Sequence, residues 1–142
     1  MTIVEFLEQR IAEDEAVAMR ASPGPWTYGD IESVAGGSLY DADQMIASIL
    51  WDNDDTRPIR RPIYEREADA NGAYMARHDP VRVLAECAAK RRIVARHDLC
   101  AACRDEGNQI EARVLEWIIR LLALPNADHP DYQEAWRLDQ PT

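Results

Sequence analysis

Two cysteines and a histidine stand close together in residues 97–103, which have the sequence HDLCAAC. The Cys-x-x-Cys spacing of Cys100 and Cys103 lets two thiolates reach one tetrahedral zinc ion, and His97 could supply a third ligand. The candidates for a fourth ligand are the remaining histidines and cysteine: His78, His129 and Cys87. Cys87 is a poor one, because a helix would place it about 15 Å from His97. The pattern makes a structural zinc site one hypothesis, and redox or nucleophilic use of the thiols is another. We favour the alternative, a helix end that carries two small, semi-buried cysteines.

Two other histidines stand beside carboxylates, in His78-Asp79-Pro80 and in Asp128-His129-Pro130-Asp131. If these side chains converged in space, they could bind a divalent metal or supply acid–base chemistry near neutral pH. The protein would then be a metal-dependent hydrolase, with four weak catalytic candidates: His78, Asp79, Asp128 and His129. The alternative is that both motifs start helices, with aspartate as the cap and proline in the first turn. We favour this structural explanation.

Arginines gather between residues 82 and 104, and Arg91, Arg92 and Arg96 are the candidates for contacts with phosphate or nucleic acid. Arginine suits this role because its guanidinium group binds phosphate with two hydrogen bonds. The wider basic set comprises Arg82, Lys90 and Arg104, with Arg57, Arg60 and Arg61 upstream. Such a run is more often a solvated helix face that pairs with carboxylates, so nucleic acid is an alternative and not the main hypothesis.

The composition narrows the class of protein. The chain has 142 residues, of which 46% are hydrophobic and 30% charged, and its formal charge of −10 argues against coating DNA with the whole surface. No run approaches the roughly 18 apolar residues of a membrane span, and the acidic N-terminal segment is unlike a secretory signal. We therefore expect a cytoplasmic protein without membrane contact. The chain also has no glycine-rich phosphate loop, GxSxG or HExxH motif, which argues modestly against an enzyme.

The N-terminal half predicts one helix followed by a small sheet. Thr2 and Glu5 have the spacing of a capping box, and apolar residues at four-residue spacing follow, so a helix is expected over residues 2–20. Residues 26–51 contain short apolar segments separated by turns and predict an antiparallel β-meander packed on helices. A helix over residues 43–51 is the competing interpretation.

The rest of the chain predicts a loop over residues 52–66 and a helical part over residues 67–138. Within it, we expect helices at residues 67–77, from Asp79-Pro80 onward and at residues 109–123, and a short terminal helix through Tyr132 and Trp136. The buried face of the helix at residues 109–123 is predicted to contain its large apolar residues: Ile110, Val114, Trp117, Ile118, Leu121 and Leu122. We expect the four tryptophans to be core or docking residues: Trp26, Trp51, Trp117 and Trp136.

Two segments stand out when they are taken together: residues 74–84, YMARHDPVRVL, and residues 121–132, LLALPNADHPDY. They are accompanied by Gly24-Pro25-Trp26 and by AKRRI at residues 89–93. With these segments, the chain resembles a family of small uncharacterised proteins from actinobacteria and their phages. In that family, an ARHDP-type helix start and a LALPxADHPDY-type segment bracket a variable middle. Residues 41–70 depart from the pattern, as does Asn126, which stands where the family has tyrosine. The resemblance implies a bacterial or phage cytoplasmic origin, and it implies no activity.

These observations predict an α+β protein, a mostly helical single domain of residues 1–142 with the meander packed on helices. The main functional hypothesis is a non-enzymatic protein-interaction module that binds an unidentified protein partner and that one zinc ion could stabilise. The metal-dependent hydrolase and the phosphate or nucleic-acid binder are the alternatives. Convergence of the four His-Asp residues would favour the hydrolase, and an arginine surface free of acidic neighbours would favour the binder.

Overall fold

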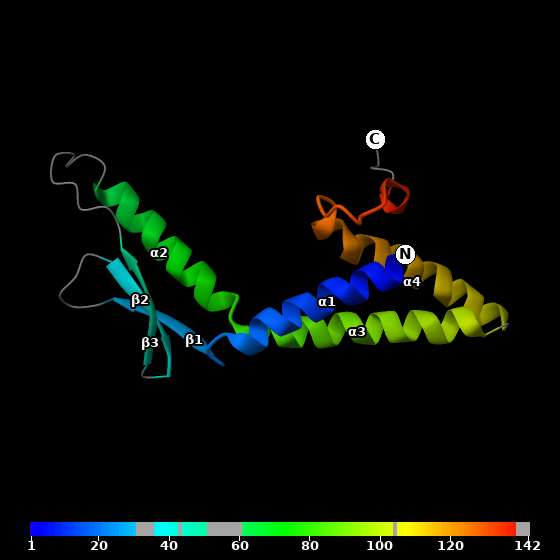
Figure 1. The fold of residues 1–142 in the computed structure, drawn as a ribbon, viewed down its shortest axis with the longest axis horizontal. Helices are drawn as coiled ribbons and strands as arrows, with labels where there is room; N and C mark the ends of the chain where they lie inside the picture. The colour runs from blue at the N-terminus through cyan, green and yellow to red at the C-terminus, as the bar shows by residue number, and fades with distance from the viewer. Residues whose placement is uncertain (31–35, 43, 51–60, 104, 139–142) are drawn as a thin grey trace. The chain divides into compact units, whose positions relative to one another are not determined.

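The computed structural model describes residues 1–30, 36–42, 44–50, 61–103 and 105–138 (Figure 1). Within them lie four helices and three strands, and the helices and strands follow one another as α1 (Ile3–Arg20), β1 (Trp26–Asp30), β2 (Gly36–Asp41), β3 (Gln44–Leu50), α2 (Arg61–Arg77), α3 (Pro80–Ala102) and α4 (Glu106–Ala123). Two short 3₁₀ turns follow, Leu124–Asn126 and Glu134–Trp136. The predicted α+β class, with helix predominant, is confirmed.

The chain divides into two compact units, and the division falls inside α1 and α3. The sheet unit comprises Val17–Leu84, and the helical unit comprises Met1–Ala16 together with Ala85–Thr142. The single-domain organisation stays a prediction.

The sheet unit contains the predicted meander. Its three strands pair antiparallel in the order β1-β2-β3, with Tyr28 opposite Leu39 and Leu39 opposite Ala47. The competing helix over residues 43–51 is therefore wrong, because residues 44–50 form β3. Helix α2 contacts all three strands. The Tyr28 hydroxyl donates a hydrogen bond of 2.9 Å to Asp69 Oδ1, and the Tyr28 ring lies where a side chain at Gly72 would have to be.

The predicted loop over residues 52–66 is only partly in agreement with the structure. Residues 51–60 lie outside the described residues, but α2 begins at Arg61, six residues before the expected start at residue 67. The prolines of this segment suggested a loop. Pro62, however, falls in the first turn of the helix, where the missing N–H removes no helical hydrogen bond.

A buried carboxylate connects the start of the sheet to the start of α3. Asp79, only 7% exposed, caps α3 because its Oδ1 accepts from the Arg82 N–H at 2.9 Å. Its Oδ2 accepts from the Trp26 N–H, the first residue of β1, at 3.0 Å. Gly24 has φ +82°, and a Cβ there would lie 3.2 Å from the same Oδ2. One carboxylate therefore fixes both the helix start and the chain that enters the sheet.

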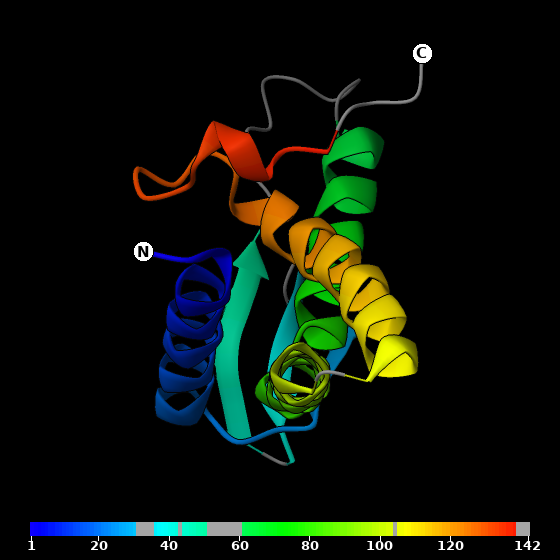
Figure 2. The same ribbon diagram turned by 90° about the vertical axis from the view of Figure 1, so that its right-hand side faces the viewer.

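The helical unit is built around α1, α3 and α4. Figure 2 looks nearly along α3 and shows α1 to one side of it and α4 to the other. The predicted capping box is confirmed: Thr2 Oγ1 accepts from the Glu5 N–H at 3.1 Å, and Glu5 Oε2 accepts from Thr2 N at 2.6 Å. Each helix contributes buried side chains to the core: Ile3, Phe6, Leu7 and Ile11 from α1, Cys87, Val94 and Cys100 from α3, and Ala112, Ile119 and Ala123 from α4.

The C-terminal segment packs its aromatic rings on α1. Phe6 is fully buried, and its ring centroid lies 5.6, 5.9 and 5.3 Å from those of His129, Tyr132 and Trp136. The predicted terminal helix is wrong, because the segment forms only the 3₁₀ turn Glu134–Trp136. Trp136 is buried and Trp26 is half-buried, as expected, whereas Trp51 lies outside the described residues.

Replacing Asp79 by alanine should reduce the free energy of unfolding by about 2–3 kcal/mol, because the helix cap is lost and the buried Trp26 N–H is left without its acceptor. The matched control is Asp105→Ala, which removes an exposed cap that accepts only from Asn108 at the start of α4, and should cost about 1 kcal/mol. Chemical denaturation of both variants measures the difference. Equal losses would show that the Trp26 contact adds nothing.

Candidate functional site

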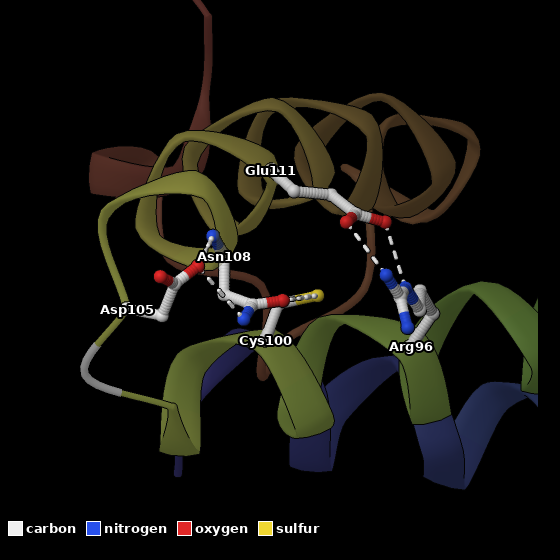
Figure 3. A network of polar contacts seen from close by, with 5 residues as sticks. All are labelled: Arg96, Cys100, Asp105, Asn108 and Glu111. Atoms are coloured by element: carbon white, nitrogen blue, oxygen red, sulfur yellow. Dashed lines mark hydrogen bonds and ion pairs between the residues drawn. The ribbon is translucent and has the colours of Figure 1, made fainter.

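Helix α4 is fixed to α3 along one face. Asp105 caps α4, because its Oδ2 accepts from the Asn108 N–H at 3.2 Å, and Asn108 Oδ1 lies 4.0 Å from the buried Cys100 Sγ (Figure 3). One turn further, Glu111 accepts two hydrogen bonds of 2.7 Å from the Arg96 guanidinium. The buried face of α4 carries small or branched side chains: Ala112, Ile119 and Ala123.

The large apolar side chains of α4 lie on the other face and are exposed. We call this set the α4 stripe: Ile110, Val114, Trp117, Leu121 and, in the following turn, Leu124. Their exposed fractions range from 58% for Ile110 to 36% for Leu124, and Trp117 is 53% exposed. The predicted buried face is therefore wrong for Ile110, Val114, Trp117 and Leu121, and Trp117 is no core residue. Only Ile118 and Leu122 of the predicted set are partly buried.

The α4 stripe is large for a single exposed helix. Its members are spaced by four, three, four and three residues, so they form one continuous row along the helix. One tryptophan and four aliphatic side chains are thus exposed in one row, and contiguous exposed apolar patches are often interaction sites on monomeric proteins.

The proposed zinc ligands have other partners in the structure. His97 Nδ1 lies 3.1 Å from Asp98 Oδ1, and its Nε2 lies 3.4 Å from Glu116 Oε2. Cys100 is buried, and burial raises the pKa of its thiol, which disfavours the thiolate that binds zinc; Cys103 is exposed. Within the described ranges, no three His, Cys, Asp or Glu side chains gather closely enough to hold a metal ion.

The four catalytic candidates fall in different units. Asp79 is occupied as the buried cap described above, and the ring of His78 stacks on Tyr74 at 4.1 Å between centroids. Both belong to the sheet unit, whereas Asp128 and His129 belong to the helical unit. There, His129 Nδ1 accepts from the Asp131 N–H at 3.1 Å, and its Nε2 contacts the Arg10 guanidinium. Except for Asp128, each candidate has a local structural contact.

The arginines of α3 are paired with carboxylates from both neighbouring helices. Arg91 donates hydrogen bonds of 2.9 and 2.6 Å to Glu15 on α1, and Arg96 is bound to Glu111 on α4. Only Arg92, of the three phosphate-binding candidates, is exposed without an ion pair within the described part of the chain. Arg57, Arg60 and Arg104 lie outside it, as does the side chain of Arg61.

A cavity that the sequence did not indicate lies between α1 and α3. It has a volume of about 270 Å³ and is lined by both helices: Glu8, Ile11, Arg91, Val94, Ala95 and Asp98. This volume is below the usual range for sites that enclose a small organic ligand. Its only cationic lining group, Arg91, is already bound to Glu15.

The fold and the exposed row on α4 define a small α+β protein whose most distinctive surface is an apolar helix face. The chain belongs to DUF6221, a family of unknown function, whose model matches residues 1–138. This agrees with the expected resemblance to a family of uncharacterised proteins. Comparison with curated proteins and with solved structures finds no match. Of the helices that the structure describes, none has the length and apolar character needed to cross a membrane.

The two faces of α4 predict opposite responses to substitution. Trp117→Gln should change the free energy of unfolding by less than about 0.5 kcal/mol, because the side chain is more than half exposed. The matched change on the other face, Ile119→Ala, should cost about 3 kcal/mol, because Ile119 is fully buried. Thermal and chemical denaturation of both variants test this difference. A large loss for Trp117→Gln would mean that the α4 stripe is part of the core.

The Arg96–Glu111 pair predicts an acid-sensitive contribution to stability. Hydrogen bonds from Arg96 hold the pKa of the Glu111 carboxyl below its ordinary value of 4.5. Because the folded-state pKa is the lower one, the pair stabilises the fold above pH 4.5, and this stabilisation is lost as the pH falls through the folded-state pKa. Glu111→Gln should therefore lower the Tm at pH 7, and the difference should shrink below pH 4.5. Thermal denaturation of both proteins across this pH range tests the prediction, and an equal difference at pH 7 and well below pH 4.5 would contradict it.

Proposed function

We propose that this protein is a non-enzymatic protein-interaction module whose contact surface is the α4 stripe. The observation that carries the proposal is the exposure of the five stripe side chains, while the opposite face of the same helix is buried in the helical unit. Burying such a row in a complex would remove apolar surface from water, and its central tryptophan is of the type that often dominates binding energy.

The polar groups of the described residues support an interaction role over an enzymatic one. Apart from Asp128 and Arg92, the described carboxylates and guanidinium groups among the candidates are bound to each other or to backbone N–H groups, as for Asp79 and for Arg96 with Glu111. No observation favours the hydrolase over this alternative. The phosphate-binding hypothesis likewise gains nothing from arginines that are already paired.

Three further hypotheses accompany the proposal. A zinc ion at His97, Cys100 and Cys103 would stabilise the junction of α3 and α4, and metal analysis of the purified protein tests it: absence of zinc at one equivalent per chain would end it. The ARHDP and LALPxADHPDY motifs support an actinobacterial or actinophage origin. With the composition, they also support action in the cytoplasm.

Photo-crosslinking at single positions tests the interaction function. Benzoylphenylalanine in place of Trp117 should form crosslinks to a defined protein when the full chain is expressed in its host, because the stripe is then buried in a complex. The same residue in place of Asp98, an exposed position on α3, is the control and should give no such product. Val114→Glu, which places a charge within the row, should abolish the crosslink at position 117. Identical products at positions 98 and 117, unaffected by Val114→Glu, would contradict the proposal.

A further inference from the structure

The spacing of the α4 stripe indicates which kind of secondary structure in a partner fits this surface. Steps of four, three, four and three residues correspond to alternating d and a positions of a heptad, with Val114 and Leu121 at a and Ile110, Trp117 and Leu124 at d. The row extends about 21 Å along the helix axis, which is four helical turns. A surface of this kind is complementary to another helix that carries the same apolar spacing.

The charges beside the stripe differ between its two flanks. Arg113 and Arg120 stand directly before the a positions, at g, and so share one flank. Arg113 is exposed and has no ion pair within the described residues, whereas Arg120 Nε lies 3.1 Å from Glu116. The e positions of the other flank are Glu111 and Ile118, and Glu111 is already neutralised by Arg96. Glu106 also stands at g, one turn before the row begins, and is exposed. Beside the row itself, residues 110–124, the charge left available to a binding helix is positive and comes from Arg113.

A second copy of the chain is a poor match for these flanks. An antiparallel pairing that places Ile110 against Leu121 and Val114 against Trp117 of a second copy also places Arg113 near the second copy's Arg120. A parallel pairing brings Glu106 near the second copy's Glu111 instead. Neither arrangement places an unpaired carboxylate opposite Arg113, and each copy adds a net charge of −10 to the other.

We infer that the partner on the α4 stripe is an amphipathic helix of a different protein, with an apolar row at heptad spacing and glutamate or aspartate beside it. This inference rests on the proposed function, because it specifies the occupant of the same surface. Apolar burial supplies affinity in such a complex, and the carboxylates opposite Arg113 and Arg120 select the partner and its register.

Three designed helical peptides test this inference with the full chain. They share one leucine and isoleucine row at heptad spacing and carry glutamate, glutamine or lysine at every e and g position. Fluorescence anisotropy should give affinities in the order glutamate, glutamine, lysine, with about a tenfold or larger difference between the first and the last. The preference should weaken as salt is added, because the flanking charges are exposed. Val114→Glu should abolish binding of all three peptides.

Charge-reversal variants separate the flank from the rest of the surface. Arg113→Glu should remove or reverse the preference for the glutamate peptide. Arg92→Glu makes the same charge change on α3, at an exposed residue without an ion pair in the described chain, and should leave the preference unchanged. Equal loss of preference in both variants would mean that net charge alone sets it, which overturns the inference.

The remaining outcomes distinguish this inference from the proposed function. Equal affinity for the three peptides, still abolished by Val114→Glu, would overturn the acidic partner and leave the interaction module standing. A dimer in analytical ultracentrifugation that Val114→Glu dissociates would assign the stripe to a second copy, which also overturns the inference. Absence of binding by every peptide overturns the inference, and the absence of a stripe-specific crosslink at position 117 would overturn the proposed function itself.

Discussion

Helix α4 carries more apolar surface than the helical unit can bury, and this constraint determines the surface of the protein. A helix presents one face to one neighbour, so residues that lie opposite each other around its axis cannot both be buried by α3. The Arg96–Glu111 pair and the Asp105 cap hold α4 with Ala112 and Ile119 inward. Trp117 lies roughly on the opposite side and must remain outside. The exposed row is therefore a consequence of how α4 is anchored.

The residues that suggest catalysis have structural roles, because their polar atoms are hydrogen-bonded within the fold. Asp79 is a buried carboxylate, and both of its oxygens accept backbone N–H groups, one at the start of α3 and one at the start of β1. Both oxygens of this carboxylate are therefore engaged in holding the fold, and the group is buried. Arg91 and Arg96 each donate from Nε and Nη2 to the two carboxylate oxygens of one partner, Glu15 and Glu111 respectively. The residue types and their spacing in the sequence identified groups that could react. The hydrogen-bond partners that the fold gives these groups determine the role of each one.

Local signals predicted most of the fold, and the burial of α4 is where they failed. The capping box of α1, the strands of residues 26–51 and the start of α3 at Pro80 all depend on neighbours within a few residues, so they could be recognised. Periodicity also showed that α4 has an apolar row, but it cannot show which row faces the core. Small residues such as Ala112 and Ala123 add little to the hydrophobic periodicity of a sequence, although they form the packed face. The C-terminal segment was misjudged for a related reason, because its rings are held by Phe6 on α1, more than a hundred residues away.

The acidic net charge of the chain and its exposed apolar row have opposite effects on association. The net charge of −10 keeps copies apart and counteracts the tendency of the row to self-associate. The same charge repels an acidic partner at long range, so such a partner would gain no electrostatic acceleration of its encounter. At the distances of a formed complex, however, the field that the partner experiences is dominated by the nearest groups, Arg113 and Arg120, because salt screens the rest within about 8 Å. For such a partner, repulsion at a distance and attraction in contact would together make binding slow to form and dependent on the register of the two helices.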